Sequence, residues 1–283
     1  MQSKQSNLWL LAVLAAPAAH FSGCGWLPVL ITAAVVLPLA RIKKDWTFSK
    51  PAALVQILWL GIVAGSLLPG SAVCWPSDNS LAVPLTLLTL AALTGAAKAP
   101  RIGAVLAFAM GLLALPVALS GVANVHIQWL KPTELDWQPM LVLVFLLTSL
   151  PAAGKGKGIW YTGALAVAIA VLEQGALSPY VAAALKDSAY QTARALGYLE
   201  PVAAAALTMG WYAMASMLFA SASNIAQKCG ISQRLSYVLP WGTATGWLLF
   251  EWQLSAPFLM GLSAFLWVLS PFFQKMKKVK NSA

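Results

Sequence analysis

The sequence predicts an all-helical integral membrane protein with ten transmembrane helices. Two observations indicate this class. Of the 283 residues, 60% are hydrophobic and only 9% are charged, which gives a mean hydropathy of +0.75. The Lys and Arg residues also concentrate in every second gap between the apolar stretches. Because no stretch is polar enough to fold as a separate soluble domain, we expect residues 1–283 to form a single membrane domain.

The spans follow from the thickness of the bilayer core. A core of about 30 Å requires roughly 20 mostly apolar residues per helix. The stretches that approach this length are residues 7–23, 25–40, 51–69, 80–97, 102–122, 138–153, 159–177, 201–224, 235–250 and 256–273.

The distribution of basic residues predicts the orientation of these helices. Fifteen of the 18 Lys and Arg residues lie on one side. They are Lys4, Arg41, Lys43, Lys44, Lys50, Lys98, Arg101, Lys155, Lys157, Lys228, Arg234, Lys275, Lys277, Lys278 and Lys280. Only Lys131, Lys186 and Arg194 lie on the other. Since basic residues in short loops stay cytoplasmic, both termini are predicted to be cytoplasmic in a cell membrane.

The net charge of +10 does not indicate nucleic-acid binding, because the cations occupy helix ends rather than one patch. We assign them to topology and to contacts with anionic lipids. Several of the 13 Trp residues fall near span ends, where an indole ring anchors a helix at the headgroup level. Trp26, Trp75 and Trp129 are among these predicted anchors.

The N-terminal segment allows two interpretations. Lys4, an apolar run and Cys24 resemble a lipoprotein signal peptide with its lipidated cysteine. A retained first helix is simpler, since the next apolar run starts at Gly25 and leaves no mature domain between anchor and helix. Cys24 and Cys74 are both predicted near the outer face, so a disulfide between them is geometrically allowed.

Proline residues interrupt spans one and six. Pro17 lies within span one, and span six is short, with Thr148 and Ser149 just before Pro151. A proline removes one backbone donor and frees a carbonyl. If ten helices divide into two halves of five, these spans occupy matching positions in inverted halves, repeat one at about 7–122 and repeat two at about 138–273. Such pairs point to a transporter's midplane site; the alternative is an ordinary pair of kinked helices.

Span eight carries a polar stripe on an otherwise apolar helix. Thr208, Tyr212 and Ser216 recur every four residues and therefore share one face. The glycine pairs Gly61 with Gly65 and Gly242 with Gly246 are better explained by close helix packing. Glu173, next to Gln174 near the outer end of span seven, is expected to have a structural or interfacial role rather than to act in a proton relay.

The sequence offers no signature of an enzyme or a metal site. Its two His and three Cys residues show no zinc-ligand spacing, and no phosphate-binding loop or nucleophile elbow is present. We therefore expect no catalytic residues, no metal and no cofactor.

Motifs along the whole chain resemble the spore germination permeases, the membrane-embedded B subunits of germinant receptors in the amino acid/polyamine/organocation superfamily. The motif before and within span eight is the clearest match. The matching segments are Gly197-Tyr198-Leu199-Glu200-Pro201, Gly210-Trp211-Tyr212-Ala213, Asn124 to Pro132, Leu150-Pro151 with Lys155 and Lys157, Pro84 with Lys98 and Arg101, and Ala16-Pro17 with Trp26.

The resemblance implies an amino-acid-transporter-like fold with a five-plus-five inverted repeat and a small ligand, expected to be an amino acid, near the midplane. It also implies partners, namely the receptor's large membrane subunit and its lipoprotein subunit, and location in the spore inner membrane. One departure concerns helix one, where alanines (Ala12, Ala15 and Ala16) stand in place of the family's glycine-bearing break.

Two functions fit this pattern: a germinant receptor subunit that senses or moves a small solute, or a secondary amino-acid transporter of the plasma membrane with no germination role. In either case the candidate ligand-binding residues come from three helices. Ala16 and Pro17 shape the break in helix one, Thr148 and Ser149 bind the ligand from helix six, and Tyr212 and Ser216 face them from helix eight.

Overall fold

The computed structural model describes residues 26–31, 34, 50–75, 80–94, 125–131 and 200–250, together with parts of 164–184 and of 190–197. These residues are mostly helical, with short turns and irregular pieces between helices, and they contain no strand. Two of the described helices are long and apolar enough to cross a membrane. The predicted helical class is therefore confirmed for this part of the chain.

The first long helix is α3, Lys50–Leu67, which continues directly into the 3-10 helix η2, Leu68–Cys74. Pro69 lies in the first turn of η2. Since proline has no N–H to donate to the preceding turn, it ends the regular α-helical pattern. The tighter 3-10 helix continues to Cys74. The apolar helical segment therefore has 25 residues and extends beyond the predicted span 51–69.

The second long helix, α9, spans Glu200–Lys228 and exceeds the predicted 201–224. Its first turn holds Glu200 and its last turn Lys228, each the charge sign that the helix dipole favours at that end. Gly230 follows with φ +64°, a left-handed conformation that glycine adopts without strain. The Ile231 N–H then donates to the Ala226 carbonyl at 2.9 Å, which closes the helix end.

Two shorter apolar helices also lie in the described part of the chain. One spans Ala82–Thr94, within the predicted span 80–97. The other, α10, spans Leu235–Leu249, almost the predicted 235–250, and contains Pro240. Further short pieces are η3, Ile127–Leu130, and α7, Pro179–Ala184.

The remaining predicted spans are covered partly or not at all. Trp26–Ile31 is helical within predicted span 25–40, and helical residues between 164 and 176 fall within predicted span 159–177. Four predicted spans lie outside the described residues: 7–23, 102–122, 138–153 and 256–273.

Glycines determine how α3 and α10 meet. A Cβ built on Gly61 would lie 1.9 Å from Thr243 Oγ1 and 2.6 Å from the Pro240 carbonyl oxygen, and one on Gly65 would lie 2.9 Å from the Ala244 carbonyl oxygen. Only glycine permits this approach. Since both residue numbers rise together along the contact, α3 and α10 run in the same direction, as the predicted topology requires.

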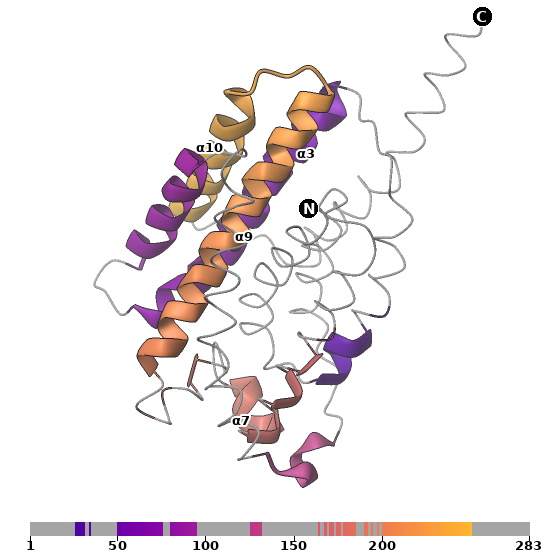
Figure 1. Cartoon of the computed structure of the whole chain (residues 1–283), viewed down its shortest axis with the longest axis vertical. Coiled ribbons are helices and arrows are strands. Elements are labelled where there is room, and N and C mark those ends of the chain that lie inside the picture. Colours follow the sequence, from indigo (N-terminus) through magenta and orange to yellow (C-terminus); the bar gives the residue numbers. More distant parts are fainter. Residues whose placement is uncertain are drawn as a thin grey trace, which may run out of the picture.

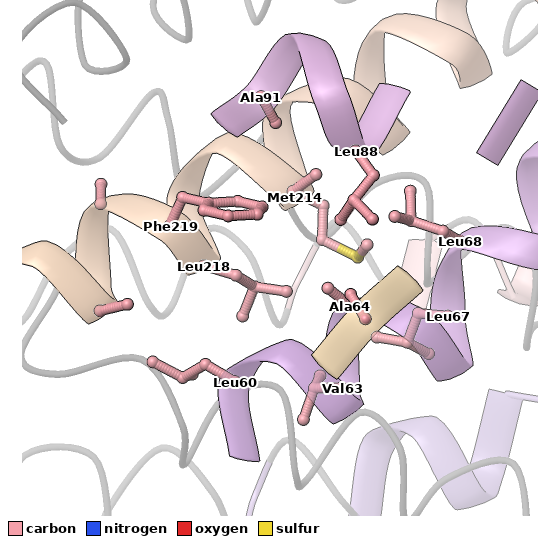
Figure 2. Close-up of a cluster of buried hydrophobic side chains, with 14 of the residues drawn as sticks. Leu60, Val63, Ala64, Leu67, Leu68, Leu88, Ala91, Met214, Leu218 and Phe219 are labelled. Carbon is pink, nitrogen blue, oxygen red and sulfur yellow. The ribbon is translucent and has the colours of Figure 1, made fainter. Parts of the chain in front are cut away.

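Helix α9 runs in the opposite direction to α3 and α10. It joins α10 through a short turn and lies along α3 (Figure 1). Buried side chains of α3, η2, α9 and the helix Ala82–Thr94 interlock between these elements (Figure 2). Leu60, Leu68, Leu88 and Met214 are among the largest side chains that are fully buried there.

Large apolar side chains also face outward from the bundle. Leu93 is 78% exposed, Val238 60% and Phe250 71%. They lie on or beside the helix Ala82–Thr94 and α10, and Leu54 and Val55 of α3 are exposed too. A bundle that is apolar both inside and on such outer positions is typical of helices surrounded by lipid.

Candidate functional site

The polar face of α9 is the candidate site, and we call Thr208, Tyr212 and Ser216 the α9 stripe. Successive members are four residues apart and so lie about one turn from each other along the helix. Buried apolar residues, including Trp211, Ala213, Met214 and Ala215, surround them in sequence. The stripe thus places three hydroxyl groups within a helix whose other buried neighbours here are apolar.

Thr208 has both of its hydrogen-bonding roles in use. Its Oγ1 hydroxyl donates to the Ala204 carbonyl one turn earlier at 2.7 Å. The same oxygen accepts the indole Nε1–H of Trp75 at 2.7 Å. Since a hydroxyl has a single hydrogen and an indole nitrogen can only donate, the direction of both bonds is determined.

Tyr212 is joined to the neighbouring apolar helix. Its hydroxyl oxygen lies 2.6 Å from Thr94 Oγ1, and the Thr94 hydroxyl also bonds to the Leu90 carbonyl of its own helix. With the Thr94 hydrogen donated to Leu90, we infer that Tyr212 is the donor to Thr94. This contact connects α9 to the last residue of the helix Ala82–Thr94.

Ser216 differs from the other two members of the stripe. Its side chain is 2% exposed, and its Oγ has no hydrogen-bond partner. A buried hydroxyl without a partner loses hydration without compensation, which is unfavourable by about 1–3 kcal/mol. Such a group is available to bind a polar atom that enters the helix bundle.

Four of the sequence-predicted site residues cannot be placed beside the stripe. Ala16, Pro17, Thr148 and Ser149 lie outside the described residues. Tyr212 and Ser216 are both described and lie on one helix, as predicted, but the convergence of helices one and six on them stays a prediction.

Two contacts of the stripe were not anticipated. The sequence predicts Trp75 as a membrane anchor and assigns no role to Thr94. Trp75 does lie at the end of η2, but it also donates a hydrogen bond to Thr208. The sequence holds no signal for either pairing, because periodicity shows which residues share a face and does not show what packs on that face.

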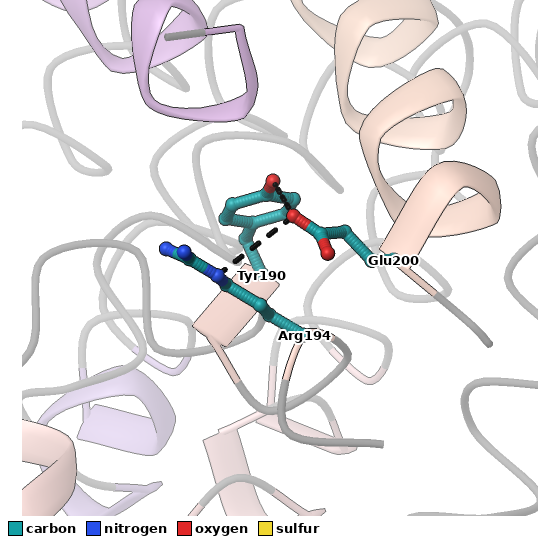
Figure 3. Close-up of polar contacts among 3 residues, drawn as sticks. All are labelled: Tyr190, Arg194 and Glu200. Carbon is teal, nitrogen blue, oxygen red and sulfur yellow. Dashed lines mark hydrogen bonds and ion pairs between the residues drawn. The ribbon is translucent and has the colours of Figure 1, made fainter. Parts of the chain in front are cut away.

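A second polar cluster lies at the N-terminal end of α9, and we call Tyr190, Arg194 and Glu200 the acid cluster. The Tyr190 hydroxyl donates to Glu200 Oε1 at 2.7 Å, and Arg194 Nε lies 3.8 Å from the same oxygen (Figure 3). Tyr190 packs on Cys74, Ala203 and Ala204. Burial, then the hydrogen bond to Glu200 and its charge, raise the pKa of Tyr190 to about 12.

Gln174 forms a third, fully bonded cluster. Its Oε1 accepts the Trp26 backbone N–H at 3.3 Å, and its Nε2 donates to the carbonyls of Trp129 and Lys131 at 2.7 and 2.8 Å. The side chain is 1% exposed. Because its donors and acceptor are used within the protein, Gln174 has a structural role. The neighbouring Glu173, for which the sequence predicts a structural or interfacial role, lies outside the described residues.

Among the described residues, no group of three His, Cys, Asp or Glu side chains could hold a metal ion. Cys74 is buried and Cys229 is half-buried. Cys24 lies outside the described part, so its predicted pairing with Cys74 stays a prediction. In comparisons with known proteins, no protein-family model and no curated protein sequence matches this chain.

Proposed function

We propose that the chain is a membrane-embedded, transporter-like protein that binds a small solute of the amino-acid class. Its role is that of a germinant receptor subunit in spore germination, acting with a large membrane subunit and a lipoprotein subunit. The full architecture proposed is ten spans in a five-plus-five inverted repeat, with both termini cytoplasmic and the solute held near the midplane.

The observation that carries this proposal is the unpartnered, 2% exposed hydroxyl of Ser216. Polar groups at membrane depth are unfavourable and are found where they serve a ligand or an ion pathway. Ser216 shares its helix face with Tyr212, whose hydroxyl is already bonded to Thr94. A solute reaching this face would meet one free hydroxyl and one that can exchange its partner.

The contacts between helices support the inverted repeat. By position, α3 and α9 are the third helices of the two proposed halves, and the helix Ala82–Thr94 and α10 are the fourth. α3 contacts α10 through Gly61 and Gly65, and α9 contacts the helix Ala82–Thr94 through Tyr212. Each third helix therefore meets the other half's fourth helix, which is the exchange that a two-fold axis in the membrane plane would produce.

The charges at helix ends support the proposed orientation. Lys50, Lys228 and Arg234 lie at one end of α3, α9 and α10. The other end, where α9 begins, carries the ion pair of Arg194 and Glu200, whose charges balance. The basic end corresponds to the cytoplasmic side under the positive-inside rule.

A thermal-shift screen of the purified protein in detergent against each of the 20 standard amino acids tests the proposal. At least one amino acid should raise the unfolding temperature. Ser216→Ala should abolish that response. It should leave the unfolding temperature without ligand unchanged or slightly higher, because the lost hydroxyl makes no bond. Ser223→Ala is the matched control, since Ser223 is a buried serine of α9 near its other end and should keep the response.

Simultaneous replacement of the helix-six hydroxyls and Tyr212 tests the site as predicted from sequence. Thr148→Val, Ser149→Ala and Tyr212→Phe together should abolish the response while the protein still accumulates in the membrane. A ligand response unchanged by these three substitutions would remove them from the site.

The alternative function is secondary transport with no germination role. Two observations separate it from the germinant receptor. A gene located beside those for the large membrane subunit and the lipoprotein subunit favours the receptor, whereas solitary location beside catabolic genes favours the transporter. Robust uptake of the stabilising amino acid into proteoliposomes would count against a subunit that only senses.

A further inference from the structure

The contact between Trp75 and Thr208 closes one end of the α9 stripe. Thr208 is the member of the stripe nearest the start of α9, and Ser216 lies two turns further along the helix. The indole Nε1–H of Trp75 occupies the Thr208 hydroxyl oxygen at 2.7 Å. A ligand donor approaching from this end would therefore find the first hydroxyl of the stripe already bonded.

The backbone below Trp75 is firmly held. Cys74 is 5% exposed and packs with Tyr190, Ala203 and Ala204, and Tyr190 is bonded in turn to Glu200 at the start of α9. The Trp75 backbone N–H donates to the Ala72 carbonyl at 3.1 Å. The end of η2 and the beginning of α9 are thereby joined without any contribution from the indole ring.

The Trp75 side chain itself is held far less. It is 48% exposed, so its indole N–H can exchange Thr208 for water with little net loss. A hydrogen bond made at such a position contributes less than a buried one, because water replaces it when it breaks. A half-exposed side chain on a fixed backbone is able to rotate without disturbing its anchor.

We propose that the Trp75 side chain is a lid on the α9 stripe. In the closed form seen here its indole N–H is bonded to the Thr208 hydroxyl oxygen; rotation of the indole breaks this bond and gives water and solutes access toward Ser216. The lid rests on the proposed function, since it regulates entry to the same stripe. The kind of group that can replace the indole is specific. Because the Thr208 hydrogen is donated to Ala204, the Thr208 oxygen can only accept, so an entering N–H group would take the place of the indole.

Thiol labelling measures this access directly and needs no ligand. Ser216→Cys is introduced into a background with Cys24→Ser, Cys74→Ala and Cys229→Ser, and the purified protein in detergent is treated with a charged, water-soluble methanethiosulfonate reagent. Trp75→Phe keeps an aromatic ring and removes the donor. It should raise the labelling rate roughly three-fold, the change in population expected from losing one solvent-exposed hydrogen bond at the lower end of the ordinary range.

Two further variants keep the experiment decisive. Thr208→Val removes the acceptor and leaves Trp75 in place, so it should accelerate labelling to a similar extent. Trp241→Phe is the matched control, because the Trp241 indole also donates to a threonine hydroxyl, Thr89 Oγ1 at 3.4 Å, away from the stripe. Its labelling rate should stay within two-fold of the parent.

The outcomes separate the lid from the proposed function. Labelling of Trp75→Phe at the parent rate, or equal acceleration by Trp241→Phe, would overturn the lid even if an amino acid stabilises the protein. Faster labelling of both Trp75→Phe and Thr208→Val, with Trp241→Phe at the parent rate, supports the lid. If no amino acid stabilises the protein while labelling accelerates, the lid stands and the assigned class of solute fails.

Discussion

The contact of α3 with α10 and the polar face of α9 are built on opposite principles. In the first, glycines bring two backbones so close that a single added methyl group at Gly61 would collide with backbone atoms of Pro240. In the second, hydroxyl groups meet partners on neighbouring elements, and one of them, Ser216, has none. Close packing defines a single arrangement, whereas exchangeable hydrogen bonds allow more than one. We infer that α3 and α10 form the fixed part and that change occurs along α9.

The largest expected effect is on the fixed part. Gly61→Ala places a Cβ 1.9 Å from Thr243 Oγ1 and 2.6 Å from the Pro240 carbonyl oxygen. Thr243 can rotate, but the backbone carbonyl cannot, so the helices must separate. We expect a loss of about 1–3 kcal/mol in the free energy of unfolding, typical of overpacking, measured by thermal unfolding in detergent.

Gly242→Ala is the matched control on the partner helix. A Cβ there meets no described atom within 4 Å, and alanine is the better helix former by roughly 0.5–1 kcal/mol. The substitution should be neutral or stabilising. Equal destabilisation by both alanines would mean that the tight contact at Gly61 does not govern stability.

The next effect, on the polar face, is smaller and concerns one bond. Tyr212→Phe removes the hydroxyl that lies 2.6 Å from Thr94 Oγ1, and the net value of such a bond is about 1 kcal/mol. Thr94→Val removes the other partner. Thermal unfolding of the two single variants and the double variant gives their coupling energy. If the effects simply add, the two hydroxyls are not bonded, and the α9 stripe is freer than the structure indicates.

The sequence predicted individual helix faces better than it predicted the contacts between them. Apolar length located α3, α9, α10 and the helix Ala82–Thr94, and four-residue spacing placed Tyr212 and Ser216 on one face. Packing at Gly61 and Gly65 was also predicted correctly. The described residues do not provide the packing predicted for Gly242 and Gly246.

The residues that contact the polar face of α9 could not be predicted from apolar length or residue spacing. Hydropathy gives every apolar helix the same signal, so nothing in the spacing of Thr94 or Trp75 indicates that they approach α9. The continuation of α3 through η2 was missed for a local reason. Pro69 ends the α-helical hydrogen bonding, yet the 3-10 coil after it extends the apolar rod to Cys74.

The smallest effect at neutral pH belongs to the acid cluster, which joins the fixed η2 to the start of α9. The pKa of Tyr190 is raised to about 12 from an ordinary value of 10.0, first by burial and then by Glu200. A raised pKa means that the folded protein holds this proton more tightly than the unfolded chain. The stabilisation is therefore complete below pH 10 and is lost as the pH rises through about 12.

Absorbance titration near 295 nm measures this ionisation. The difference between the parent and Tyr190→Phe should be a single tyrosine that titrates near pH 12 and later than a free phenol. A difference curve for Tyr190 centred at pH 10 would show that its phenol is neither buried nor bonded to Glu200. The end of η2 would then lack its Tyr190 link to the start of α9, and the boundary between the fixed part and the α9 stripe would begin before Trp75 rather than at it.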